Sequence, residues 1–228
     1  MPSTPDPVPV RDAATVILVR SRRGAAPSVL MGQRGAAAVF MASKFVFPGG
    51  AVEADDAALE VDAALEPATA ARLAVDTPPE VARALPFAAV RELWEETGLV
   101  LGRRDASAPT RTVPDAWRDF HAAGFVPNVA ALRLFFRAVT PPGRPRRFDA
   151  RFFVAHAADL ADDAVPSGEE LSGLAWLELP AARALELPFI TELVLTELDE
   201  ALRGAGLDAA RPVPFFHQGE GGARYRML

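Results

Sequence analysis

The sequence predicts a mixed α/β (α+β) fold in which a mixed β-sheet is sandwiched between helices. Two observations carry this prediction: residues 13–19 form a β-branched apolar run typical of a buried strand, and residues 189–202 place apolar side chains at helical spacing. Further strand-like and helical stretches lie between them, and a sheet of this kind buries its faces against helices. Because the chain has 228 residues and is 50% apolar, it can bury a full core, and we expect one domain over residues 10–228.

The N-terminal part predicts two strands followed by a glycine turn. Residues 13–19 and 29–33 are apolar runs separated by the segment SRRGAAP, which is typical of a turn. Residues 44–47 then lead into Pro48, Gly49 and Gly50. Two consecutive glycines allow close backbone approaches that other residues cannot adopt, so a main-chain carbonyl here can lie near a metal.

The middle of the chain predicts helices. Residues 55–86 hold Ala, Leu and Glu at helical spacing and are interrupted by proline at 67 and at 78–79, so we expect several short helices. A further helix is expected from Phe87, because its side chains form a stripe that should be buried. This stripe consists of Phe87, Val90, Trp94 and Thr97.

The C-terminal half predicts a strand pair, a short strand and a terminal helix. Residues 131–139 and 148–155 are apolar runs joined by the proline-rich segment TPPGRPRR. Trp176 lies in another short strand-like run, and residues 189–202 form the amphipathic terminal helix.

Charge and composition argue against several classes of partner. The formal net charge of −6 disfavours a broad nucleic-acid or anionic-membrane surface, because clustered Lys and Arg attract such partners. The sequence has no cysteine, which excludes a disulfide framework and a thiol nucleophile. No segment reaches the ~20 apolar residues that a spanning helix needs, and the N-terminus lacks a signal-peptide pattern. We therefore expect a cytoplasmic protein with no nucleic-acid and no membrane partner.

The segment RELWEETGL, residues 91–99, carries the strongest chemical signal. Glu92, Glu95 and Glu96 stand at i, i+3 and i+4, so all three project from one face of the expected helix. Like charges at these spacings repel by roughly 0.2–0.5 kcal/mol per pair. A divalent cation would reverse this effect, because hard cations such as Mg2+ are held by carboxylate oxygens. The alternative is a solvated acidic face.

A second segment, FPGG at residues 47–50, precedes Glu53, Asp55 and Asp56. Together the two segments resemble the box of the Nudix hydrolases, which reads G, five residues, E, seven residues, REUxEExGU, with U aliphatic. The second half matches throughout residues 91–99, and the first half matches at Gly50, with Asp56 in place of the usual Glu. Residues 57–90 replace the family's seven, so a helical insertion over residues 57–86 is expected inside the box.

The split box resembles a particular Nudix subgroup, which includes the animal peroxisomal coenzyme A diphosphatases. Three other segments are similar to that subgroup: residues 29–35, 40–50 and 145–153. The resemblance implies a metal-dependent hydrolase that cleaves the pyrophosphate bond of a nucleoside diphosphate linked to another moiety. A coenzyme A-type substrate is the first candidate.

The resemblance also implies roles for the box residues. Glu92, Glu95 and Glu96 are expected to bind Mg2+ or Mn2+, and the carbonyl of Gly49 is expected to add a ligand. Glu92 is also a candidate for proton abstraction. Arg91 is expected to orient the box glutamates by ion pairing instead of meeting the substrate.

A further carboxylate is expected from a loop before the last core strand. Glu170 lies six residues before Trp176, a spacing that many Nudix chains show, so we expect it to act as the catalytic base, with Glu169 as the alternative. Glu53 and Asp56 are weaker candidates, because the shorter Asp56 reaches a metal only through water. An acidic turn is the simpler explanation for both.

Three arginines are expected to contact substrate phosphate: Arg34, Arg147 and Arg151. Guanidinium groups match phosphate with two parallel hydrogen bonds, which favours this role. A structural ion pair, such as Arg147 with Asp149, is the alternative. The three histidines, at 121, 156 and 217, have no metal-ligand spacing, so we expect them to be structural or exposed.

Two other functional classes stay open. A nucleotide-sensing Nudix-fold module would bind its ligand without turnover, although such modules typically lose box carboxylates that this chain keeps. An interaction scaffold would use the insertion or the terminal helix as a protein-binding surface, and either could also form the interface of a homodimer.

Overall fold

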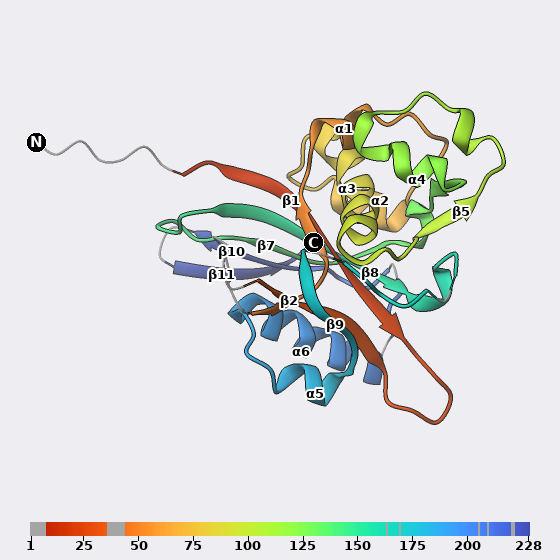
Figure 1. Ribbon diagram of the computed structural model, residues 1–228. Helices are drawn as coiled ribbons and strands as arrows, with labels where there is room; N and C mark the ends of the chain where they lie inside the picture. Colours follow the sequence, from red (N-terminus) through yellow and green to blue (C-terminus); the bar gives the residue numbers. More distant parts are fainter. Residues whose placement is uncertain are drawn as a thin grey trace, which may run out of the picture.

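The computed structural model describes residues 8–35, 44–162, 164–168, 170–204, 206–208, 210–219 and 222–228. Within these residues the main chain forms one large mixed sheet and helices on both of its faces (Figure 1). The predicted fold class is therefore confirmed. The alternative base Glu169 and part of the segment 40–50 lie outside the described residues.

The sheet has the order β11-β10-β7-β8-β1-β2-β3, with β4 paired to β1 and β9 paired to β2. Strands β1 and β8 run parallel, as do β7 and β10, and the other pairs are antiparallel. The strands are β1 Val10–Arg20, β2 Ser28–Arg34, β3 Phe45–Val46, β4 Gly49–Ala51, β7 Arg133–Val139, β8 Arg147–His156, β9 Leu171–Glu178, β10 Pro214–Gly219 and β11 Gly222–Met227. A separate ladder joins β5 Gly102–Arg104 to β6 Phe125–Pro127.

The two faces of the sheet carry different helices. On one side of the sheet lie α2 Pro67–Leu73 and α3 Pro79–Thr97, with α1 Ala54–Ala58 and α4 Arg118–Ala122 packed against α3, and on the other side lie α5 Leu179–Arg183 and α6 Phe189–Arg203 (Figure 1). Successive side chains of a strand point to opposite faces. Val16 and Leu18 of β1 therefore join the core around α3, whereas Ile17 and Val19 join the core around α6. This double burial explains why residues 13–19 are apolar without alternation.

The prolines of the insertion begin helices instead of interrupting them. Pro67 and Pro79 are the first residues of α2 and α3, where the missing N–H of proline costs no hydrogen bond. Helix α3 thus begins at Pro79, not at Phe87 as the buried stripe predicted, and it contains Pro86. Of the predicted insertion, α2 and the start of α3 are helical, while residues 60–66 have no regular secondary structure.

An aromatic layer covers α3 on the side away from the sheet. The Trp117 ring packs edge-on against Phe87 at 6.2 Å and against Phe120 at 5.5 Å between centroids, and Trp94 packs against Phe120 at 5.7 Å. Helix α3 is therefore buried between this layer and the sheet, so its apolar residues extend beyond the single predicted stripe. None of the helices in the described ranges is long and apolar enough to cross a membrane.

Candidate functional site

The two halves of the split box meet through a buried ion pair. Asp56 in α1 is fully buried, and Arg91 in α3 donates from Nε to its Oδ1 at 2.8 Å and from Nη2 to its Oδ2 at 2.9 Å. Arg91 Nη2 also donates to the carbonyl of Ala51, at the end of β4, at 3.0 Å. The segments that the insertion separates in the sequence are thus adjacent in space. Asp56 acts as the counter-ion of Arg91.

Arg91 also holds two of the three box glutamates. Its Nη1 donates to Glu92 Oε1 at 2.9 Å and to Glu95 Oε2 at 2.8 Å. Burial lowers the pKa of Arg91, but the hydrogen bond to Asp56 and the nearby charges of Glu92 and Asp56 raise it above its ordinary value. Arg91 therefore stays charged and pairs with both glutamates, and its orienting role in the reaction stays a prediction.

The third glutamate, Glu96, faces the glycine turn. The backbone N–H of Gly49 donates to Glu96 Oε2 at 2.7 Å, and Glu96 is 2% exposed. Close approach explains both glycines: a Cβ on Gly49 would lie 2.4 Å from the Ala14 carbonyl oxygen, and a Cβ on Gly50 would lie 2.4 Å from Glu92 Oε1. The Gly49 N–H makes this contact, and the metal-binding role expected of the Gly49 carbonyl stays a prediction.

Burial makes the box carboxylates hard to ionise. Burial, with the nearby charge of Glu95, raises the pKa of Glu92 to about 7, although Arg91 opposes the shift. Burial also raises the pKa of Glu96 to about 8 against the hydrogen bond from Gly49, and it raises the pKa of Glu95. The acidic face is thus largely desolvated, which argues against the simple solvated-surface alternative for Glu92 and Glu96.

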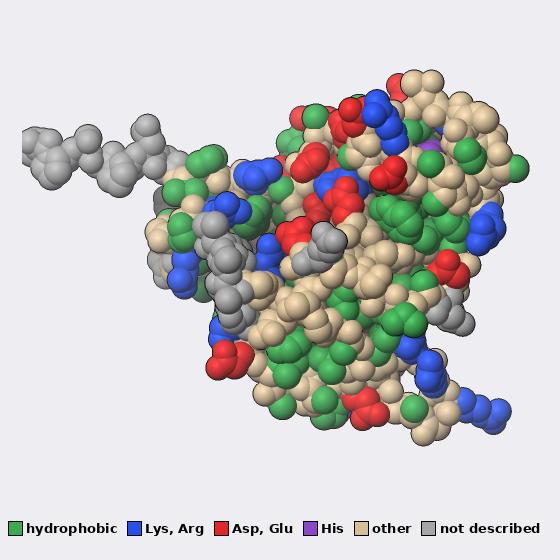
Figure 2. Space-filling model, in the orientation of Figure 1, with side chains coloured by type: hydrophobic (Ala, Val, Ile, Leu, Met, Phe, Trp, Pro, Cys, Tyr) green, Lys and Arg blue, Asp and Glu red, His purple; other side chains and the backbone are tan. Residues whose placement is uncertain are grey.

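The three glutamates have two different hydrogen-bond partners. Glu92 and Glu95 accept hydrogen bonds from Arg91, and Glu96 accepts one from the N–H of Gly49. In the part of the chain that the structure describes, no group of three or more His, Asp or Glu side chains is arranged to hold a metal ion. The metal-binding roles of these residues stay predictions. On the surface, acidic side chains gather around a basic one where α1 and α3 meet the sheet (Figure 2).

Glu170 and Arg34, predicted from separate segments, lie beside each other. Arg34 Nη2 is 3.7 Å from Glu170 Oε1, and their side chains are 27% and 65% exposed. The negative charge of Glu170 contributes to the raised pKa values of Glu92 and Glu96, which places it near the box. The structure therefore brings Arg34, Glu170 and the box glutamates into one region.

Arg151 lies inside the protein. It is 1% exposed, and its Nη1 donates to Asp12 Oδ1 at 2.5 Å while its Nη2 donates to Thr77 Oγ1 at 3.1 Å. These contacts join β1 and β8 to the turn before α3. A direct contact between Arg151 and the substrate stays a prediction. The burial of the Arg151 side chain favours a structural role.

The proposed partner of Asp149 was wrong. Asp149 accepts two hydrogen bonds from Arg137, from Nε at 2.9 Å and from Nη2 at 2.7 Å, and it also pairs with Arg151. Arg147 instead donates from Nε to the carbonyl of Thr140 at 3.1 Å and lies half-buried at the start of β8. Its substrate role stays a prediction. Sequence spacing missed Arg137, because its contact with Asp149 depends on the register of β7 and β8.

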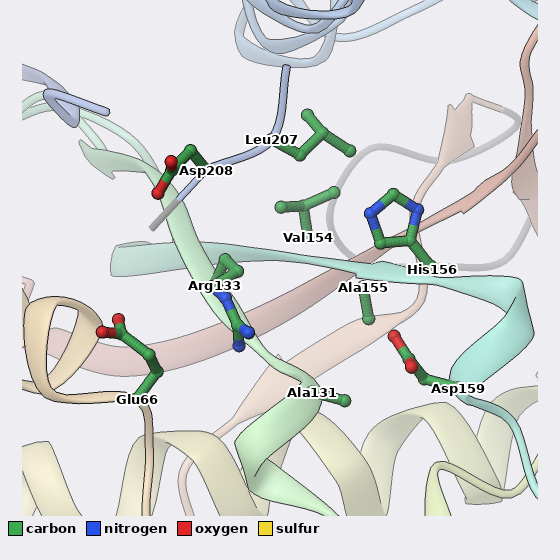
Figure 3. A pocket seen from close by; sticks show the side chains of 9 residues that line it. All are labelled: Glu66, Ala131, Arg133, Val154, Ala155, His156, Asp159, Leu207 and Asp208. Carbon is green, nitrogen blue, oxygen red and sulfur yellow. The ribbon is translucent and has the colours of Figure 1, made fainter. Parts of the chain in front are cut away.

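A cavity lies away from these residues. It measures about 350 Å³ and is lined by the ends of β7 and β8, the start of α2 and the segment after α6 (Figure 3). Arg133 and His156 line it with three carboxylates, Glu66, Asp159 and Asp208. None of the predicted site residues lines this cavity.

His121 is buried, with Nδ1 3.0 Å from the Trp117 carbonyl oxygen, as expected for a structural histidine.

The chain is similar to known proteins in sequence and in fold. The chain is 28% identical over 233 residues to acyl-coenzyme A diphosphatase NUDT19 of Gallus gallus; the match covers 75% of this chain and 62% of that protein. The crystal structure of a Nudix hydrolase from Alicyclobacillus acidocaldarius superimposes with a TM-score of 0.66 and 26% identity, covering 88% of this chain and 99% of the other. No family model matches the sequence.

Proposed function

Because the chain belongs to the Nudix hydrolase superfamily, we propose that it is a metal-dependent pyrophosphohydrolase that cleaves a nucleoside diphosphate linked to another moiety. The observation that carries the proposal is the position of Arg91. It binds Asp56 on one side of the insertion and Glu92 and Glu95 on the other. An insertion that had destroyed the box would leave no reason for this buried contact.

The proposed metal is Mg2+ or Mn2+, held by Glu92, Glu95, Glu96 and the carbonyl of Gly49. The donor set fits such ions, because it consists of carboxylate and carbonyl oxygens. Its charge also fits: Arg91 pairs with Glu92 and Glu95 but not with Glu96, and burial raises the pKa of Glu92 to about 7 and that of Glu96 to about 8. When bound, the metal would neutralise charge on the phosphoryl oxygens and polarise the bond that breaks.

The remaining roles fall to residues around the box. Arg91, fixed by Asp56, keeps Glu92 and Glu95 on the same side of α3. Glu170 takes the proton of the attacking water, and Glu92 is the alternative base. Arg34, whose guanidinium lies next to Glu170, binds a substrate phosphate. A base must lie within hydrogen-bonding reach of that water. This role therefore requires Glu170 to lie close to the box glutamates, which would hold the metal.

A coenzyme A-type compound is the first substrate to test. Its support is the similarity to the Gallus gallus acyl-coenzyme A diphosphatase. The match covers about 62% of the length of that relative. The substrate of the relative therefore cannot be assigned to this chain from the similarity alone. ADP-ribose, dinucleotides and capped nucleotides belong in the same panel.

The test is direct turnover of purified protein with each diphosphate in the presence of Mg2+ or Mn2+. The expected result is cleavage between the two phosphorus atoms, which gives two monophosphate products that chromatography separates. A Glu96→Gln variant serves as the matched control, because it removes one buried carboxylate charge while keeping its size. Tight binding of a compound without products would favour the nucleotide-sensing alternative, and the absence of both would contradict the proposal.

A further inference from the structure

The last turn of α3 is capped by a distant segment of the chain. The final carbonyl groups of a helix have no partner within the helix. Here the N–H of Ser167 donates to the carbonyl of Thr97 at 2.9 Å, and the N–H of Gly98 donates to that of Trp94 at 2.8 Å. The segment at 167–168 is thereby docked onto the end of the helix that carries the box glutamates.

Gly168 makes this docking possible. A Cβ built on Gly168 would lie 1.9 Å from the carbonyl oxygen of Glu96 and 2.7 Å from its carbonyl carbon, whereas real Cβ atoms essentially never come closer than 3.0 Å. Gly168 does not have a positive φ. The requirement for glycine therefore comes from contact with the backbone of Glu96 and not from an unusual backbone conformation.

A second glycine contact fixes the chain just after Glu170. Leu171, the first residue of β9, is 1% exposed and packs against Gly32 of β2, where an added Cβ would lie 2.8 Å from the Leu171 Cβ. Gly168 and Leu171 are three positions apart in the sequence, so these two points can be at most about 11 Å apart along an extended chain. Glu170 lies between two anchors and has little freedom to leave the box region while both hold.

We propose that Gly168 is a positioning residue for the reaction: by docking against Glu96, it sets where Glu170 stands relative to the box glutamates. This inference rests on the proposed function, because Glu170 is the base of that reaction. The ion pair between Arg34 and Glu170 is too exposed to act as the main anchor, since water screens the attraction between exposed charges. The backbone contact at Gly168 is the stronger constraint.

The test is Gly168→Ala with the kinetic constants measured separately. Moving the added Cβ from 1.9 Å to at least 3.0 Å requires a shift of more than 1 Å, and a misplacement of about 1 Å can lower a rate by about 100-fold. We expect kcat to fall about 10- to 100-fold, with KM and the Mg2+ half-saturation changing less than about twofold. Gly35→Ala is the control, because an added Cβ there has no neighbour within 4 Å.

A double-mutant cycle separates positioning from general damage. If Gly168 acts through Glu170, then Gly168→Ala should lower kcat little further in a Glu170→Gln background. Fully additive losses, or an unchanged kcat in Gly168→Ala, would overturn the proposal. Should Gly168→Ala fail to fold, one glycine inserted after Gly168 lengthens the tether without adding a Cβ. This insertion should give the same loss of kcat, and an unchanged kcat would overturn the proposal.

Hydrogen exchange of the Ser167 amide distinguishes the inference from the proposed function. Its bond to Thr97 should protect it in the wild-type protein, and Gly168→Ala should increase its exchange rate. Wild-type protein that turns over no diphosphate contradicts the proposed function, and the positioning role with it, whatever the exchange shows. An active wild-type protein whose Ser167 exchanges at the same rate in Gly168→Ala contradicts the inference alone.

Discussion

Replacing Asp56 by Asn tests whether the buried ion pair holds the split box together. Asp56 accepts two hydrogen bonds from Arg91 and one, at 2.9 Å, from the backbone N–H of Glu53. Asn keeps the size of the side chain but removes its charge and turns an N–H group toward one of these donors. Arg91 would keep Glu92 and Glu95 as counter-ions.

The expected loss of stability is large because the pair is buried. Removing one partner of a buried ion pair costs about 3–5 kcal/mol, and Asp56 is 0% exposed. Since Arg91 retains two other carboxylates, we expect the lower end, about 3 kcal/mol. For a chain of this length, each kcal/mol corresponds to about 2–4 °C, so Tm should fall by about 6–12 °C.

The assay is urea denaturation together with a thermal scan, both in EDTA so that metal does not contribute. Asp62→Asn is the matched control, because it makes the same chemical change at an exposed position of the nearby insertion. Asp56→Asn should also lower kcat, since Arg91 loses the group that fixes its Nε and Nη2. A variant as stable and as active as Asp62→Asn would refute the idea that this pair joins the box.

Three further predictions concern the carboxylates. Glu95→Gln and Glu96→Gln should each lower turnover at limiting Mg2+ by more than about tenfold, since each loses a charged ligand; wild-type turnover in both would contradict the metal site. Burial raises the pKa of Glu92 to about 7 and that of Glu96 to about 8. The folded state therefore binds more protons than the unfolded state in this range. The metal-free protein should lose stability as the pH rises from about 4.5 to 8. Thermal scans against pH should show this loss, saturating Mg2+ should reverse it at pH 8, and a flat profile in EDTA would contradict it. Glu170→Gln should lower kcat strongly with little change in Mg2+ dependence, whereas Glu169→Gln should be mild; equal, mild effects would return proton abstraction to Glu92.

Local patterns predicted those features of the fold that depend on neighbouring residues. The apolar run at residues 13–19 and the helical spacing at residues 189–202 correspond to β1 and α6. The buried stripe places the start of α3 too late, because Pro78 and Pro79 resemble a break in the helical pattern, although proline is favoured in the first turn of a helix. The identity of a proline indicates a boundary but does not say on which side the helix lies.

In the candidate site, too, local patterns predicted only the features that depend on neighbouring residues. Helical spacing placed Glu92, Glu95 and Glu96 together, because i, i+3 and i+4 positions share a face. The partners of buried arginines could not be predicted in this way. Arg137 and Asp149 meet because Arg137 lies opposite Arg151, and Val139 lies opposite Asp149, in the ladder of β7 and β8. Such a contact depends on tertiary register, which no spacing within one segment encodes.

The box tolerates the insertion because the contact between Asp56 and Arg91 does not depend on the length of the chain that connects these two residues. The entropic cost of closing a loop rises only with the logarithm of its length, by about 0.6 kcal/mol for each doubling. The insertion also buries side chains of its own, such as Leu59 and Leu73, in the core around α3, and Arg83 donates to the carbonyls of Ala57 and Leu59 at 2.9 and 2.7 Å. These contacts offset the additional loop entropy and hold α1 against α3. A short connection between Asp56 and Arg91 is therefore not required for the box to form; a buried acid opposite Arg91 and an ordered connection suffice.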